Sequence, residues 1–310
     1  MTNRTLFDVL GTKYDPEINT EENLKAAGMA NWNIRSVPVY AVMSDRDVPM
    51  GRYATLRTRP GDRSKRDVLG ETKEKYSAVD NATNLEFMGE LADSLNRQVN
   101  KVTWGLGHLG ATPDGKKVFF TLESGWAGTE GIVLVLLDSH DGTLARQLRV
   151  GYVDPRTGGL LNVPLGGGST GVVKLTSNGA PVPVTSSQVM EEVGRYERDR
   201  LDLIHWYEPL HSRDEARKLV TQALGDPGNA KSTVTRRSNQ VDEVLSFLGG
   251  QEERGVNRWD LLMAVCGWSD FSAPVRGAKL GGLQPKRAEK SLYFPNRKQR
   301  ALETLFGGQE

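Results

Sequence analysis

Basic side chains interleaved with aromatic ones are the residues of this chain best suited to binding a ligand. Between Arg276 and Arg300 there are eight basic residues against one acid, Glu289, and Tyr293 and Phe294 lie among them. Guanidinium and ammonium groups neutralise phosphates, and aromatic rings stack on unpaired bases. The candidate DNA-binding residues of this segment are Lys286, Arg287, Lys290, Arg297, Lys298 and Arg300.

Two further basic groups precede this segment. Between Arg52 and Arg66 six basic residues stand against one acid, Asp62, and Tyr53 lies among them. The candidates in this group are Arg63, Lys65 and Arg66. A third set lies where the strands of the expected sheet end: Lys101, Lys116, Lys117, Arg146 and Arg149. The formal net charge is only +1, so any binding of nucleic acid has to come from such local patches. Solvated surface is the alternative interpretation of each patch.

No motif of the chain predicts catalysis or a cofactor. None of the four histidines has the spacing of a metal ligand, and His108 is expected in the core. Ser139-His140-Asp141 is no catalytic triad, because adjacent residues of a turn cannot point at one another. The glycines of 166–170 lack the lysine of a P-loop, and those of 105–110 lie within a predicted strand. We therefore expect no metal, no cofactor and no enzymatic activity.

Composition limits the class of protein. The chain has 310 residues and a single cysteine, Cys266, which excludes a disulfide framework within it and favours a reducing compartment. No apolar run is long enough to span a membrane, and no signal-peptide core follows the first residues. We therefore expect a protein of the cytoplasm that does not enter the membrane.

Hydrophobic periodicity predicts a helix followed by four strands. Apolar residues at Leu85, Met88, Ala92 and Leu95 mark one helix face, and Thr83 to Glu86 has the pattern of a capping box. Period-two alternation then predicts two strands joined by a turn, a wholly apolar run predicts a central strand, and a return strand follows. The corresponding ranges are 102–107, 112–115 for the turn, 118–122, 132–137 and 143–150. We expect Leu85, Met88, Leu95, Val118, Phe120, Leu134 and Leu136 to be buried together.

Helical patterns dominate the second half of the chain. Helices are expected from residue 187 to a break at Pro209 and over 213–224, 239–248, 257–268 and 297–306. Before them, residues 154–185 form a loop-rich span, and a short helix at 20–27 and a strand at 37–42 belong to an N-terminal cap. The expected fold class is α+β, with a helix packed on a curved antiparallel sheet and a mostly helical C-terminal half. We divide it into an α+β core at 1–185 and a helical region at 186–310 packed on that core.

The order of several short motifs resembles a phage/plasmid-like protein family of unknown function. The N-terminal matches are Leu10-Gly11-Thr12, Thr20-Glu21, Leu24, Ala26 to Met29, and Trp32. The next are Leu69-Gly70, Tyr76, Val79, Asn81 and Phe87, and then Ser139 to Thr143 with Arg149-Val150. The C-terminal matches are Asn257-Arg258-Trp259, Ala264-Val265, Arg287-Ala288-Glu289 and Lys298 to Leu302. In place of the family's Val-Cys-x-Asn-Thr segment this chain has residues 151–156, so a role tied to that segment is not carried over.

The resemblance implies a bacteriophage, prophage or plasmid origin and action in the host bacterial cytoplasm. The order of elements is also similar, at the level of fold, to single-strand annealing proteins of the Rad fifty-two type. Our first hypothesis is a single-stranded-DNA-binding or annealing protein of homologous recombination that needs no nucleotide and forms a ring or filament of identical subunits. The alternatives are a non-catalytic accessory protein that binds a host or phage protein, and an enzyme, such as a nuclease, whose site is assembled from distant residues.

Overall fold

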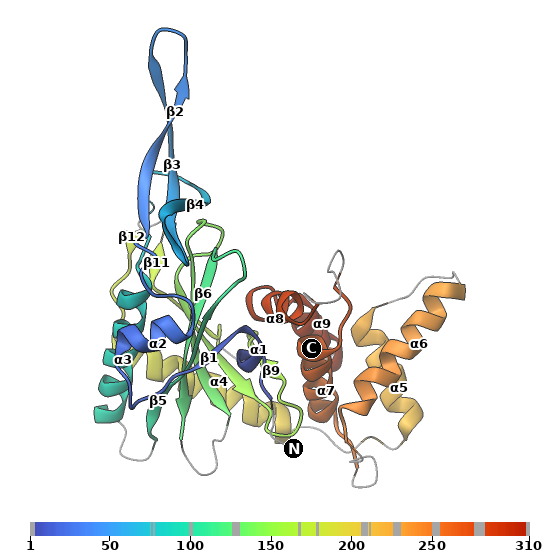
Figure 1. Ribbon diagram of the computed structural model, residues 1–310. Coiled ribbons are helices and arrows are strands. Elements are labelled where there is room, and N and C mark those ends of the chain that lie inside the picture. Colours follow the sequence, from blue (N-terminus) through green and yellow to red (C-terminus); the bar gives the residue numbers. More distant parts are fainter. Residues whose placement is uncertain are drawn as a thin grey trace. The chain divides into compact units, whose positions relative to one another are not determined.

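The chain has an α+β fold, as predicted (Figure 1). The computed structural model describes residues 4–74, 76, 78–98, 102–125, 131–166, 169–177, 180–205, 210, 212–225, 231–249, 255–275 and 283–307. Its contacts divide the chain into two units. The sheet unit comprises Leu10–Arg149 and Val172–Met190, and the helical unit comprises Met1–Val9, Val150–Gly171 and Glu191–Glu310. Thus 150–171 belongs with the helices, whereas our division placed it in the α+β core. None of the described helices has the length and apolar character that crossing a bilayer requires.

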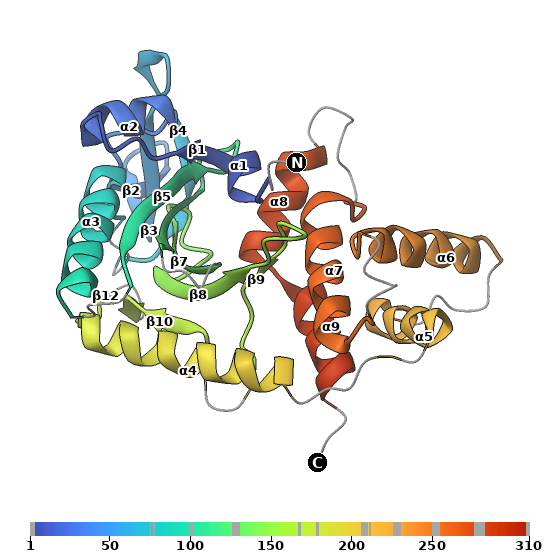
Figure 2. The same cartoon turned by 90° about the horizontal axis from the view of Figure 1, so that it is seen from below.

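An antiparallel sheet with the strand order β1-β5-β6-β7-β8-β10 forms the framework of the sheet unit. Its strands are β1 (Gly11–Lys13), β5 (Trp104–Ala111), β6 (Lys117–Ser124), β7 (Ile132–Ser139), β8 (Gln147–Val153) and β10 (Val172–Lys174). Every residue of β7 is buried, as its unbroken apolar run predicts for a central strand. The turn between β5 and β6 has Gly115 at a φ of 71°, a conformation that favours glycine. Figure 2 shows that the sheet curves.

Helix α3 (Asn81–Gln98) contacts β5 and β6 and closes the core of the sheet unit. All seven predicted core residues are buried, because the apolar face of α3 meets the inward side chains of β6 and β7. The predicted capping box is wrong. The helix begins at Asn81, so Thr83 lies inside its first turn, and the Asp80 carboxylate accepts from the amide of Ala82 instead. The short helix α2 (Thr20–Ala26) contacts α3, and its own capping box is formed by Asn19 and Glu22.

The sheet unit also contains a three-stranded sheet, which extends away from the larger antiparallel sheet (Figure 1). Its strands are β2 (Arg35–Val42), β3 (Asp47–Arg59) and β4 (Asp62–Thr72), in the order β2-β3-β4. Beyond Tyr53 only β2 and β3 pair, so the far end is a two-stranded ribbon that we call the arm, residues 38–50. The sequence predicted only a short strand here, because exposed strands lack a buried face to set the alternation.

Helices build most of the helical unit, together with the short strand β9 (Leu160–Leu161), which pairs with the end of β8. The helices are α1 (Phe7–Leu10), α4 (Ser186–His205), α5 (Arg213–Leu224), α6 (Lys231–Ser246), α7 (Arg258–Phe271), α8 (Leu283–Tyr293) and α9 (Asn296–Phe306). Helix α4 begins in the sheet unit and ends in the helical unit. The remaining strands, β11 (Thr176–Ser177) and β12 (Ala180–Pro181), pair with each other and belong to the sheet unit. Helix α6 begins eight residues before its predicted start at 239, and α8 was not predicted.

Candidate nucleic-acid interface

Helix α7 is the central element around which the basic residues of the helical unit are placed. Residues Trp259 to Asp270 are all buried, and α5, α6, α8, α9 and β9 contact the helix. Its first turn is fixed by a capping box, in which Asn257 accepts from the amide of Asp260 while Asp260 accepts from the amide of Asn257. A helix that is buried on all sides packs against a neighbour on each face. The positions of those neighbours are therefore set by their packing on α7. The cations discussed next belong to those neighbours.

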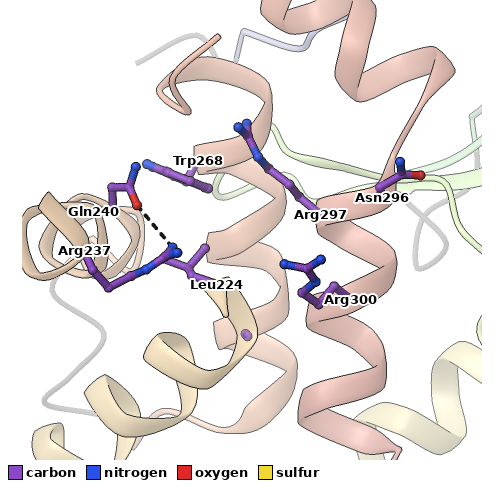
Figure 3. A pocket seen from close by; sticks show the side chains of 8 residues that line it. Leu224, Arg237, Gln240, Trp268, Asn296, Arg297 and Arg300 are labelled. Atoms are coloured by element: carbon purple, nitrogen blue, oxygen red, sulfur yellow. Dashed lines mark hydrogen bonds between the residues drawn. The ribbon is translucent and has the colours of Figure 1, made fainter. Parts of the chain in front are cut away.

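A cavity of about 230 Å³, which we call the arginine pocket, opens between α5, α6, α7 and α9 (Figure 3). Its lining residues are Ala223, Leu224, Arg237, Gln240, Trp268, Asn296, Arg297 and Arg300. Figure 3 shows Arg237 and Arg300 reaching toward each other from α6 and α9. Arg237 Nη1 donates to Gln240 Oε1 at 3.2 Å, and the Arg297 guanidinium lies 5.4 Å from the centre of the Trp268 ring.

A second cavity of about 310 Å³, the Phe294 pocket, shares Asn296 and Arg297 with the first. Its other lining residues are Ser269, Val275, Arg287, Lys290, Ser291 and Phe294. Phe294 is 51% exposed, whereas the adjacent Tyr293 is buried. The shared residues place the two pockets next to each other, and the half-exposed ring of Phe294 lines the second one.

Positive charge is not neutralised by the residues that line these pockets. Among the described residues, the two linings contain Arg237, Arg287, Lys290, Arg297 and Arg300 and no carboxylate. The pKa of Arg297 is lowered by partial burial and then by the positive charges of Arg287 and Arg237. A guanidinium whose charge is disfavoured by its neighbours gains from the approach of an anion. The carboxylate of Glu243 accepts from Trp268 Nε1 at 2.9 Å, and its negative charge also acts on Arg287.

The six cations predicted on α8 and α9 differ in burial and in their contacts. Lys298 is fully buried and its Nζ lies 2.8 Å from Asp270 Oδ1, so it cannot reach a phosphate and we withdraw it as a candidate. Arg287 donates from Nε to the Ala273 carbonyl at 2.6 Å, and Arg297 donates to the Pro274 carbonyl at 2.9 Å. Both arginines thus use part of their donors to hold the chain that follows α7. Lys290 and Arg300 are exposed, and Lys286 is exposed outside both pockets.

The candidates of the sheet unit do not share one site. Arg63, Lys65 and Arg66 are exposed on β4, and Lys65 Nζ lies 3.2 Å from Asp62. Arg146 turns inward, where its Nε donates to Asn84 Oδ1 at 2.8 Å and its guanidinium lies 4.7 Å from the centre of the Phe87 ring.

Four candidates of the sheet unit remain. Lys117 is buried, whereas Lys116 and Arg149 are half-buried. Lys101 lies outside the described residues.

The Ser139-His140-Asp141 run is part of a buried polar cluster. Ser139 Oγ donates to the Leu144 carbonyl at 2.9 Å, and Asp141 Oδ1 accepts from the amide of Thr143 at 3.0 Å. His140 Nε2 lies 3.3 Å from Asn81 Oδ1. The three side chains have different partners, which confirms that they do not form a triad. Among the described residues no group of three or more His, Cys, Asp or Glu side chains is placed to hold a metal ion.

Sequence reasoning missed Arg237. The predicted start of α6 at 239 left Arg236 and Arg237 in a loop, so their position beside α9 was not considered. The available signal was the spacing of Val234 and Val241, which are seven residues or about two helical turns apart and so extend the helical period to before 239. That side chains of α6 and α9 line the same cavity is a tertiary property that no local pattern contains.

Comparison with known proteins gave no relative: no family model, no curated protein and no solved structure matches this chain.

Proposed function

We propose that the protein binds single-stranded DNA and anneals complementary strands in phage homologous recombination, without catalysis and without nucleotide hydrolysis. The observation that supports this proposal is the joint lining of the two pockets, in which the described residues include five cations and no carboxylate. A concentration of positive charge on an otherwise nearly neutral chain favours a polyanion over a neutral partner. The phage origin, the host bacterial cytoplasm and the role in recombination rest on the motif resemblance alone.

The exposed ring of Phe294 supports a single strand rather than a duplex. Lys290, Arg287 and Arg297 line the same pocket as this ring. A base can stack on an aromatic face only when it is not already stacked inside a duplex, and cations beside the ring hold the flanking phosphates. Stacking of this kind tolerates every base, so the binding is expected to depend little on sequence.

Fluorescence anisotropy with a labelled oligonucleotide at several salt concentrations tests the proposal. Each phosphate neutralised on a single strand contributes about 0.7 to the slope of log affinity against log salt. The double variant Lys290→Ala with Arg300→Ala should therefore flatten the slope by roughly 1.4 and weaken binding to all sequences alike. Phe294→Ala should weaken single-strand binding without changing the slope. A strand-pairing assay without nucleotide then tests annealing.

The matched control is Arg63→Ala with Lys65→Ala and Arg66→Ala, which removes three exposed cations of the sheet unit. If binding uses the pockets alone, this variant keeps the wild-type slope. Equal flattening by both variants would assign the strand to a wider surface. Absence of any binding at low salt would refute the proposal.

A second candidate function, binding of a protein, is favoured by the arm. Tyr40 and Val42 are exposed on one face of the ribbon, and Val48 and Met50 are exposed on the other. An apolar two-stranded ribbon is marginal alone in water, so it gains stability when it is covered. We propose a second copy of this chain as the cover.

Charge complementarity supports this choice of partner. The end of the arm carries two acids, Asp45 and Asp47, against one base, Arg46, whereas the far end of β4 carries the bases Arg63 and Arg66. Contact between one copy's acidic end and the next copy's basic end is heterologous, and such contacts generate rings or filaments.

A further inference from the structure

The arginine pocket is a cavity with a closed floor rather than an open groove. Its floor consists of buried residues, among them Trp268, which is 2% exposed, whereas Asn296, Arg297 and Arg300 are exposed at its rim. A phosphodiester strand passing over a surface needs an open groove with cations along it. A closed floor with cations around it accommodates the end of a ligand instead.

Three guanidinium groups surround this one cavity. Arg237 comes from α6, while Arg297 and Arg300 come from adjacent turns of α9 (Figure 3). A bridging phosphate of a strand carries one negative charge, whereas a terminal phosphate monoester carries about −1.5 to −2 at pH 7 and offers three strong acceptor oxygens. Guanidinium forks match such oxygens in pairs. The positive charge of the three guanidinium groups is therefore better matched by a phosphate monoester than by a single phosphodiester.

The amino end of α9 adds a second contribution at the same rim. The helix has 11 residues, its N-cap is Pro295, and no side chain caps its first amides. Asn296, its first residue, lines the cavity. The amide of Asn296 donates to the Phe294 carbonyl at 2.8 Å, so the contribution of this end is the positive end of the helix dipole, which favours an anion. The dipole and the three arginines come from different features of the fold and favour the same charge.

We propose that the arginine pocket binds the terminal phosphate monoester of a DNA strand, so that the protein recognises strand ends as well as strand interiors. This inference rests on the proposed function, since it names the part of the single strand that enters this pocket. The Phe294 pocket next to it would then stack the bases and bind the interior phosphates of the strand.

Competition between matched oligonucleotides tests this inference. The probes are one sequence with a 5′-phosphate, with a 3′-phosphate and with hydroxyl groups at both ends, each measured against the wild type by anisotropy. We expect at least one phosphorylated probe to bind tenfold or more tightly than the hydroxyl probe, and the preferred probe identifies which end is held. Arg300→Gln and Arg237→Gln should abolish this preference, whereas Lys290→Ala should weaken all three probes by the same factor.

The outcomes separate the two proposals. Equal affinity for all three probes, with strand binding intact, overturns the end-recognition inference and leaves the proposed function standing. A phosphate preference that survives both arginine substitutions also overturns it. Failure of every probe to bind refutes the proposed function and the inference together. Arg300 is exposed, so Arg300→Gln should fold normally, and its melting temperature checks this directly.

Discussion

Lys298 and Asp270 form an ion pair of 2.8 Å in which neither side chain is exposed to solvent. Lys298 Nζ also donates to the Leu160 carbonyl, and Asp270 Oδ2 accepts from the Leu160 amide at 2.7 Å. Asp270 further accepts from the hydroxyl of Ser291. The pair therefore joins β9, α7, α8 and α9 inside the helical unit.

Replacing Lys298 by methionine should strongly destabilise the protein. The change leaves the carboxylate of Asp270 buried without its cation, and loss of one partner of a buried pair costs about 3–5 kcal/mol. Urea denaturation followed by circular dichroism measures the loss. The control Arg300→Met, on the exposed side of the same helix, should stay within about 0.5 kcal/mol of the wild type. A loss below about 1 kcal/mol for Lys298→Met would show that the pair is not needed.

Acidification should destabilise the chain through His140. Burial, and secondarily the charge of Arg57, lowers the pKa of His140 to about 4, whereas the unfolded state keeps the ordinary value of 6.5. Between these values the unfolded state binds the proton and the folded state does not. The free energy of unfolding should therefore fall as pH drops from 6.5 towards 4, by about 3 kcal/mol in total from this group. Above pH 6.5 both states are neutral and His140 contributes no slope.

His140→Gln isolates this effect. Neighbouring Asp138 has a raised pKa because it is buried, so acidification acts on it with the opposite sign. The difference between the pH profiles of the wild type and of the variant removes the contribution of Asp138. Parallel profiles between pH 4 and 6.5 would mean that His140 is protonated as easily in the folded state as in the unfolded one.

Charged substitutions on the arm should reduce self-association. Val42 is 86% exposed and Met50 is 55% exposed, on opposite faces of the ribbon. Val42→Lys with Met50→Lys makes burial of either face against a second copy unfavourable. Light scattering should show an assembly for the wild type and a smaller mass for the variant. The matched control is Val234→Lys, another exposed apolar position, on α6. A wild type that is monomeric with and without single-stranded DNA would contradict the assembly.

The core of the sheet unit could be predicted from the sequence because periodicity and burial are local there. Leu85, Met88 and Leu95 repeat with the helical period, and the run 132–137 is apolar throughout, so each pattern defines its element and its buried face. The helices predicted at 213–224, 257–268 and 297–306 correspond to α5, α7 and α9, whose bounds lie within a few residues of these ranges.

The candidate site was predicted only in part. The sequence identified Arg287, Lys290, Arg297 and Arg300, but it also selected Lys298. Lys298 is a cation like its neighbours, and only the direction of its side chain on the helix is different. On α9 the side chains at 297 and 300 point outward while 298 points inward, a difference that depends on which face the helix buries. Arg237 required the packing of α6 near α9, and the arm lacked a buried face to reveal it. Charge density in a sequence therefore indicates a region, and tertiary packing decides which cations face a ligand.

The discontinuity of the helical unit determines the order in which the chain can fold. Its parts, Met1–Val9, Val150–Gly171 and Glu191–Glu310, are separated by the two stretches of the sheet unit. Ribosomes add about 5–20 residues per second, so the segment ending at Val9 waits roughly 10 to 35 s for Glu191 to be synthesised. The sheet unit is complete once Met190 has emerged, so it can fold while most of the helices are still absent. A nascent chain halted at residue 185 would leave Leu160 without the Asp270 carboxylate that its amide binds, and it would expose the apolar strand β9 to chaperones and proteases.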